Sequence, residues 1–175
     1  MFLVGCTGKT DHVSEGLTLR QKLLQSNGCA FDAVICANYS DCSYVFTLRC
    51  TVDQAGDLTF TVIDPESING ISGTVTSAGG DLRFDDTVLG FDPVAGDLIS
   101  PVGAPWLFIK TLQGGYLHAV QKDPSGTVLI IDDTYRQNSV RAHILVSNDS
   151  APVSCEFYWK GKRYLSMDVC NFIFM

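Results

Sequence analysis

The sequence lacks the features that mark several large classes of protein. Its 12 basic residues form no long run, and 19 acidic residues give a formal net charge of −7. Because contacts to nucleic-acid phosphates need clustered cations, this balance argues against a nucleic-acid binder. No apolar stretch reaches the roughly 18 residues that a membrane-spanning helix needs. Glu is also scarce, with three residues against sixteen Asp. Since Asp favours turns and Glu favours helices, the composition predicts strands and turns.

The motifs of common catalytic and cofactor sites are missing too. There is no GxGxxG or Walker pattern, no GxSxG elbow, no EF-hand loop and no CxxC pair. His118 and His143, the latter sharing a side with Arg141, are best interpreted as exposed strand histidines. The acidic pairs read as turns or strand ends; they are Asp64/Glu66, Asp85-Asp86 and Asp132-Asp133. A Cys–His pair is formally possible, because a cysteine nucleophile needs only a base nearby in space, but nothing singles out one cysteine. We therefore expect no enzyme, no cofactor and no metal site.

Cysteine, in contrast, is plentiful: the 175 residues contain seven, an odd number. The chain begins Met1-Phe2 and continues Leu3-Val4-Gly5-Cys6, which resembles the lipobox of bacterial lipoproteins. In that motif the cysteine carries a lipid and becomes the mature N-terminus. A short polar tether follows at residues 7–12, whereas the charged region and most of the apolar region of a signal peptide are not in the sequence. We therefore expect Cys6 to be the lipidation site; the alternative is a frayed start with a stray cysteine.

The other six cysteines are even in number, and an exported chain permits them up to three disulfides in 15 connectivities. They are Cys29, Cys36, Cys42, Cys50, Cys155 and Cys170. The alternative is that several are small buried apolar residues, which suits Cys50 on an apolar strand face. Cys155 and Cys170 flank a predicted hairpin. The sequence leaves the pairing open.

Hydrophobic periodicity predicts one leading helix followed by many strands. Residues 14–28 read as an amphipathic helix, capped by Ser14 and ended by Asn27-Gly28. From residue 42 to residue 53 apolar and polar residues alternate, and the pattern resumes at residue 58 after a turn. Further strands are predicted at residues 71–77, 80–85, 87–91, 116–122, 127–134, 140–147, 153–159 and 164–174.

The middle of the chain breaks this pattern. Residues 98–105 contain two prolines and are predicted to form no strand, and Trp106–Leu112 reads as a second helix that ends at Gly114-Gly115. A single antiparallel sheet of about ten strands must curl. We expect a mainly β half-barrel, with the N-terminal helix and the mid-chain helix covering its concave face. Residues 1–13 would be the lipobox remnant and tether, and residues 14–175 one domain.

Nine apolar side chains are candidates for binding an apolar ligand. Alternation directs the strand residues among them into the curve of the sheet, and the helix residues would close the space. They are Phe46, Leu48, Phe60, Val62, Leu82, Phe84, Trp106, Leu107 and Leu112. The alternative is that they form a filled core, which leaves no void larger than water.

Four segments resemble the lipoprotein-carrier superfamily, that of LolA and LolB, and most closely the LolA-like lipoproteins of clostridia and other Firmicutes. These segments are residues 60–71, residues 81–85 together with 88–91, residues 99–105 and residues 165–172. The resemblance implies a hydrophobic cavity that holds acyl chains, although the true carriers are soluble. It gives no counterpart of the carriers' lid-holding Arg, since Arg49 falls on an outward strand face.

The sequence thus predicts a non-catalytic lipoprotein, anchored to the cell membrane on its extracytoplasmic side through lipidated Cys6. It would bind an acyl chain or another apolar ligand between sheet and helices. The alternative is a surface lipoprotein with a filled core, which contacts a protein partner as an interaction or sensor module.

Overall fold

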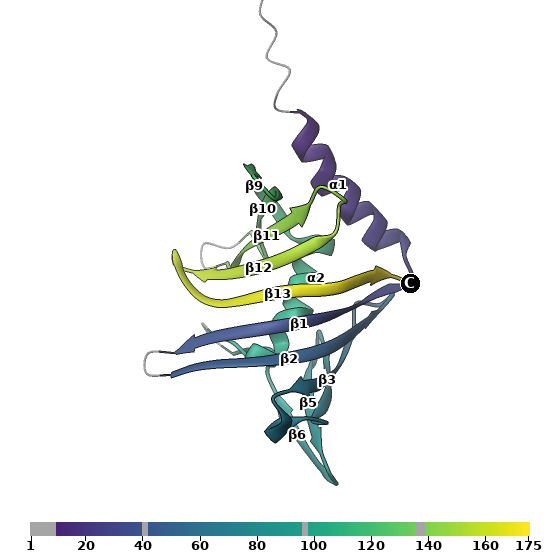
Figure 1. Ribbon diagram of the computed structural model, residues 1–175, viewed down its shortest axis with the longest axis vertical. Helices are drawn as coiled ribbons and strands as arrows, with labels where there is room; N and C mark the ends of the chain where they lie inside the picture. The colour runs from purple at the N-terminus through teal and green to yellow at the C-terminus, as the bar shows by residue number, and fades with distance from the viewer. Residues whose placement is uncertain (1–9, 40–41, 96–97, 136–138) are drawn as a thin grey trace, which may run out of the picture.

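One antiparallel sheet forms the frame of the molecule (Figure 1). The computed structural model describes residues 10–39, 42–95, 98–135 and 139–175. The sheet has 11 strands in the order β6-β5-β4-β3-β2-β1-β13-β12-β11-β10-β9. They are β1 (Gly28–Tyr39), β2 (Cys42–Asp53), β3 (Leu58–Asp64), β4 (Ser72–Thr76), β5 (Gly79–Phe84), β6 (Thr87–Phe91), β9 (Tyr116–Asp123), β10 (Gly126–Asp132), β11 (Arg141–Ser147), β12 (Pro152–Trp159) and β13 (Lys162–Phe174). The predicted mainly β class and the long open sheet are confirmed.

The leading helix, α1 (Thr10–Gln25), starts and ends earlier than the predicted helix at residues 14–28. Ser14 therefore lies inside the helix and is not its N-cap. The predicted start was wrong because residues 10–12 are polar and Val13 alone gives no apolar periodicity, although the backbone of these residues is helical. Three residues at the predicted end, from Ser26 to Gly28, instead lead into the first strand, where Met175 hydrogen-bonds back to Asn27 and Gly28.

Strand β1 is absent from the predicted elements, although it is one of the longest in the sheet. It pairs with β2 on one side and with β13 on the other, so it joins the two halves of the molecule. Its inner face is buried through Phe31 and Ile35, but small apolar residues such as Ala30 and Val34 occupy the outer face as well. This weak alternation hides the strand from a test based on periodicity.

The remaining hairpins follow the predicted pattern closely. Strands β2 and β6 have the predicted bounds, and β3 alternates between buried and more exposed residues as expected. One correction concerns the segment predicted to contain no strand. Val94–Ala95 (β7) and Leu98–Ile99 (β8) pair as a two-residue ribbon, before the short helices η2 (Pro101–Gly103) and α2 (Ala104–Gly114). Another short helix, η1 (Glu66–Ile68), precedes β4.

Both helices pack on the concave face of the sheet (Figure 1). In that view α2 passes behind β13, β1 and β2. A Cβ on Gly16 of α1 would lie only 2.8 Å from Leu129 Cδ2 on β10. Arg20 ties the helices together, since its Nε donates to Leu112 O at 2.6 Å and its Nη2 to Gly115 O at 2.7 Å. These are carbonyls at the C-terminus of α2, where cations are favourable.

The described cysteines support the interpretation as buried apolar residues. Cys29, Cys50 and Cys155 are buried free thiols in the core, while Cys170 is an exposed free thiol on the outer face. The Cys36 sulfur lies 3.7 Å from the hydroxyl of Ser43 on the neighbouring strand. Cys6 and the side chain of Cys42 lie outside the described residues.

Candidate functional site

The nine predicted ligand-binding residues all belong to the concave side, but they differ in exposure. Six are buried in one apolar core: Leu48, Phe60, Val62, Trp106, Leu107 and Leu112. Phe46 and Leu82 are partly buried and pack against this core. Phe84, near the tip of the β5–β6 hairpin, is 56% exposed. The alternation therefore predicts the face of each strand residue correctly, and the nine residues range from fully buried to more than half exposed.

Helix α2 occupies much of the space that the curved sheet encloses. Eight of its 11 residues are buried, and a helix that is apolar on all sides belongs in a protein interior. Phe108, which is fully buried, meets Phe31 of β1 edge to face at a ring distance of 5.8 Å. Under this helix the sheet therefore contacts closely packed side chains, as the filled-core alternative expects.

Beyond the helix, the concave face continues as an exposed apolar strip on the β5–β6 hairpin. Leu82 lies directly opposite Leu89, and Phe91 lies opposite Gly80, so their side chains share the face that is buried elsewhere. We call Leu82, Phe84, Leu89 and Phe91 the rim. Leu82 and Phe91 pack against the core, whereas Leu89 is 61% exposed. The rim thus extends the apolar core into solvent.

A pocket of about 280 Å³ adjoins the rim where α2 approaches the β4–β5 turn. Trp106 and Leu107 are the two predicted residues that line it, and Asp92, which directly follows the rim residue Phe91, lines it as well. Lys110 places its ammonium 4.5 Å from the centre of the Trp106 ring. We call this space the α2 pocket. It combines an apolar wall with a cation and the carboxylates of Asp92 and Asp133.

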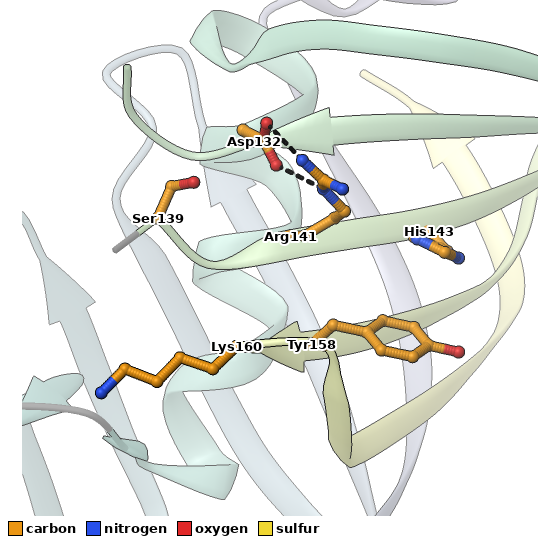
Figure 2. A pocket seen from close by; sticks show the side chains of 7 residues that line it. Asp132, Ser139, Arg141, His143, Tyr158 and Lys160 are labelled. Carbon is orange, nitrogen blue, oxygen red and sulfur yellow. Dashed lines mark hydrogen bonds and ion pairs between the residues drawn. The ribbon is translucent and has the colours of Figure 1, made fainter. Parts of the chain in front are cut away.

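A second pocket, of about 390 Å³, lies on the outer face of the sheet over β10, β11 and β12 (Figure 2). Arg141 is held by two bonds to the carboxylate of Asp132, from Nε at 2.7 Å and from Nη2 at 3.0 Å. His143, two positions along β11, stacks on Tyr158 with ring centres 4.4 Å apart. Lys160 and Ser139, which are also labelled in Figure 2, line the pocket as well. We call this the outer-face pocket.

The charges around the outer-face pocket are largely paired within the sheet. Tyr158 donates a hydrogen bond to Glu156 Oε2 at 2.7 Å, and Arg163 binds the other oxygen. Burial raises the pKa of Glu156, but these two partners outweigh it and hold the pKa below its ordinary value. Burial lowers the pKa of His143, more than the nearby Glu156 raises it. The hydrogen bond to Asp132 raises the pKa of Arg141.

This arrangement suits hydrogen bonding to a polar group, but it shows no catalytic constellation. The sequence draws attention to Arg141, His143 and the Asp132-Asp133 pair separately, and it does not reveal that they meet. Tyr158 and Lys160 carry no signal in the sequence at all. Only the strand register could have found the cluster, since Asp132 pairs with Arg141 and Arg141 with Tyr158. Within the described part of the chain, no group of three or more His, Cys, Asp or Glu residues is placed to hold a metal.

The architecture is similar to solved structures from bacteria. A LolA superfamily protein from Nitrosomonas europaea superposes with a TM-score of 0.52 at 8% sequence identity, over 94% of this chain and 93% of that protein. The fold is similar to that of the LolA superfamily. An uncharacterized conserved protein from Thermus thermophilus gives a TM-score of 0.50 at 12% identity, over 93% of this chain and 87% of that one. No model of a known protein family and no curated protein matches the sequence.

This LolA-like fold is the one that the sequence resemblance predicts, and identities this low show the fold alone. Arg49 lies on the outer face of β2, as predicted, and its Nε lies 3.3 Å from Asp32 Oδ1 on β1. It does not reach the concave side. None of the helices in the described ranges is long and apolar enough to cross a membrane.

Proposed function

We propose that the protein binds an acyl chain or another apolar ligand, without catalysis, along the rim and into the α2 pocket. The observation that carries this proposal is the rim itself. Its side chains lie on the face that forms the core, yet Phe84 and Leu89 remain more than half exposed. The LolA-like fold supports the same interpretation, since it places helices over this face.

The energetics of this site favour an extended apolar ligand over a compact one. Each buried methylene contributes about 0.8 kcal/mol, so eight methylenes laid along the rim contribute about 6 kcal/mol. This exceeds the lower estimates of the cost of association, about 4 kcal/mol. The α2 pocket would take the polar end of the ligand, since Lys110 offers a donor and Asp133 an acceptor.

The two faces of β6 supply a matched test. Leu89 is 61% exposed on the concave face, and Val88, its neighbour, is 62% exposed on the outer face. Uptake of a fluorescent fatty acid should weaken about tenfold or more in Leu89→Asp, because a carboxylate replaces an apolar contact. Val88→Asp adds the same charge to the same strand and should stay close to the wild type. Equal uptake in both variants, or none in the wild type, would contradict the proposal.

A second readout locates the ligand. Trp106 and Trp159 are the two tryptophans of the chain. In a Trp159→Phe background, a brominated fatty acid should quench the fluorescence of Trp106, which lines the α2 pocket. Quenching that is absent while uptake persists would place the ligand elsewhere.

We also propose that Cys6 carries a lipid that anchors the protein to the membrane on its extracytoplasmic side. The support is the Leu3-Val4-Gly5-Cys6 pattern. Mass spectrometry of protein purified from membranes of its own host should show a diacylglyceryl group on this cysteine. The Cys6→Ser variant should lose both the modification and the membrane fraction. An unmodified Cys6 would refute the anchor and leave ligand binding untouched.

A further inference from the structure

The two edges of the sheet differ in how they are protected from pairing. At one edge, β9 carries His118, Lys122 and Asp123, and its pairing with β10 contains a register shift. Charged residues and irregular pairing are the usual means by which an edge strand avoids pairing with another chain. At the other edge, β6 (Thr87–Phe91) has no charged residue, no proline and an unbroken register with β5. No strand of the described residues pairs with its free side.

The register shows which backbone groups of β6 face outward. A two-residue turn, Asp85-Asp86, closes the β5–β6 hairpin, so Phe84 and Thr87 form the hydrogen-bonded pair next to it. Bonding alternates along an antiparallel pair, so Leu89 and Phe91 also turn their N–H and C=O groups toward β5. The groups of Val88 and Gly90 turn away from it. An incoming strand would find two donors and two acceptors there.

The negative charge around β6 determines which kind of partner segment would bind at this edge. Residues 79–92 contain four Asp and one Arg, a net charge of 1 − 4 = −3. The Arg, Arg83, is engaged, since its Nε lies 3.0 Å from Asp81 Oδ1. The remaining acids, Asp85, Asp86 and Asp92, are exposed at the two ends of β6. Because opposite charges across an interface attract and like charges repel, these ends favour a partner with basic flanks.

A second copy of the chain fits this edge poorly in the antiparallel register that pairs the two β6 strands over their full length. If Val88 of one copy faced Gly90 of the other in an antiparallel pair, Asp86 would face Asp92 at both ends. Like charges directly opposite each other destabilise a strand pair. Two aspartates at the hairpin tip also argue against its insertion into an anionic membrane.

We propose that β6 is a docking edge for an extended segment of a partner protein, one with alternating apolar residues between basic flanks. The segment adds a twelfth strand to the 11-stranded sheet, with main-chain hydrogen bonds to Val88 and Gly90. The acidic ends of β6 set the preference for its flanks. This contact uses the backbone edge of β6 and is separate from ligand binding by the rim side chains.

The probe is a fluorescein-labelled octapeptide, Lys-Lys-Val-Thr-Val-Thr-Lys-Lys, whose binding is followed by fluorescence anisotropy. A control peptide with Glu in place of each Lys should bind about tenfold more weakly or worse at low salt. The lysine peptide with every second amide N-methylated along one edge should also lose binding, since it keeps the charge but not the donors.

Gly90→Pro tests the edge from the side of the protein. It removes an outward N–H and places a ring on the free side, which an edge strand tolerates. Binding of the lysine peptide should weaken about tenfold or more. Gly90→Ala, which keeps the N–H, should bind within about twofold of the wild type, because a Cβ there has no neighbour closer than 4.0 Å. Slow hydrogen exchange of the Leu89 amide would show that the hairpin remains intact in the proline variant.

Val88→Lys is the second test variant, for use if the proline variant fails to fold. It should weaken the lysine peptide and strengthen the glutamate peptide relative to the wild type. Equal binding of the lysine peptide to the wild type and to Gly90→Pro overturns the proposal, as does no binding to either. A wild-type dimer that Gly90→Pro converts to a monomer also overturns it, because the edge would then belong to a second copy.

Discussion

Gly73 of β4 lies at the point where the β5–β6 hairpin joins the rest of the sheet. It pairs with Phe60 on β3 and with Leu82 on β5. A Cβ at this position would lie 2.1 Å from the backbone oxygen of Asp81 and 2.8 Å from the ring of Phe60, which is 1% exposed. Since non-bonded carbon contacts are about 3.5–4.0 Å, an alanine methyl needs a shift of more than about 1 Å in β5 or in the core.

The Gly73→Ala substitution should therefore destabilise the protein strongly. Overpacking in a filled core costs about 1–3 kcal/mol, and a weakened strand hydrogen bond adds about 1 kcal/mol, so we expect a loss of about 2–4 kcal/mol. With a urea slope of about 2 kcal/mol/M, the midpoint of unfolding should fall by about 1–2 M. Tryptophan fluorescence during urea titration measures this shift.

Gly114→Ala is the matched control, since it is the same chemical change at the end of α2. A Cβ there meets no atom within 4 Å. Because alanine is the better helix former, this variant should gain up to about 1 kcal/mol of unfolding free energy. A loss below about 1 kcal/mol for Gly73→Ala, or shifts of the same sign in both variants, would refute the packing that we describe.

Three further predictions concern the described side chains. Burial raises the pKa of Cys29 to about 12 and raises those of the other two buried thiols. A thiol reagent at pH 8 should therefore label Cys170 in the native protein and these three only after unfolding, as peptide mapping would show; native labelling of the three would be inconsistent with the fold. Arg141→Met leaves Asp132, 8% exposed, without its paired hydrogen bonds and should lower the unfolding free energy by about 2 kcal/mol. Arg141→Lys should restore only part of the lost unfolding free energy, because an ammonium cannot donate the two parallel hydrogen bonds that the planar guanidinium gives to Asp132. Full recovery in urea titrations would contradict the two-bond geometry. Burial lowers the pKa of His143 below 6.5. Just below pH 6.5 the unfolded chain therefore has a proton on His143 that the folded chain lacks. The wild type should lose stability relative to His143→Phe as the pH falls from about 7 to below 6.5, and identical pH profiles would argue against a half-buried neutral His143.

Local alternation accounts for most of the predicted fold. The bounds of β2 match those predicted from the sequence, because this antiparallel strand has one buried and one exposed face. Those of β6 match as well, although most of this strand is exposed on both faces. Strand β1 escapes this test because it lies at the centre of the sheet and has small apolar residues on both faces. The start of α1 is not predicted because the polar residues 10–12 extend the helix without adding to its apolar face.

The candidate sites show a different limit. Alternation predicts that Leu82 and Phe84 face the concave side, and they do. It does not predict that Phe84 would be exposed, since exposure depends on how far α2 reaches across the sheet. The outer-face pocket depends on the register that places Asp132 beside Arg141 and Arg141 beside Tyr158, and alternation within one strand does not determine that register.

The sequence by itself determined the class of the fold, the strand-rich order of elements and the face on which the apolar side chains of the predicted strands lie. These follow from short-range periodicity, because the alternation of apolar and polar residues along a strand can be seen from neighbouring residues alone. Only the tertiary structure decided whether the space inside the curve is open. That outcome depends on the summed volume of side chains brought together from distant strands and from α2, which fill the centre and leave the rim exposed.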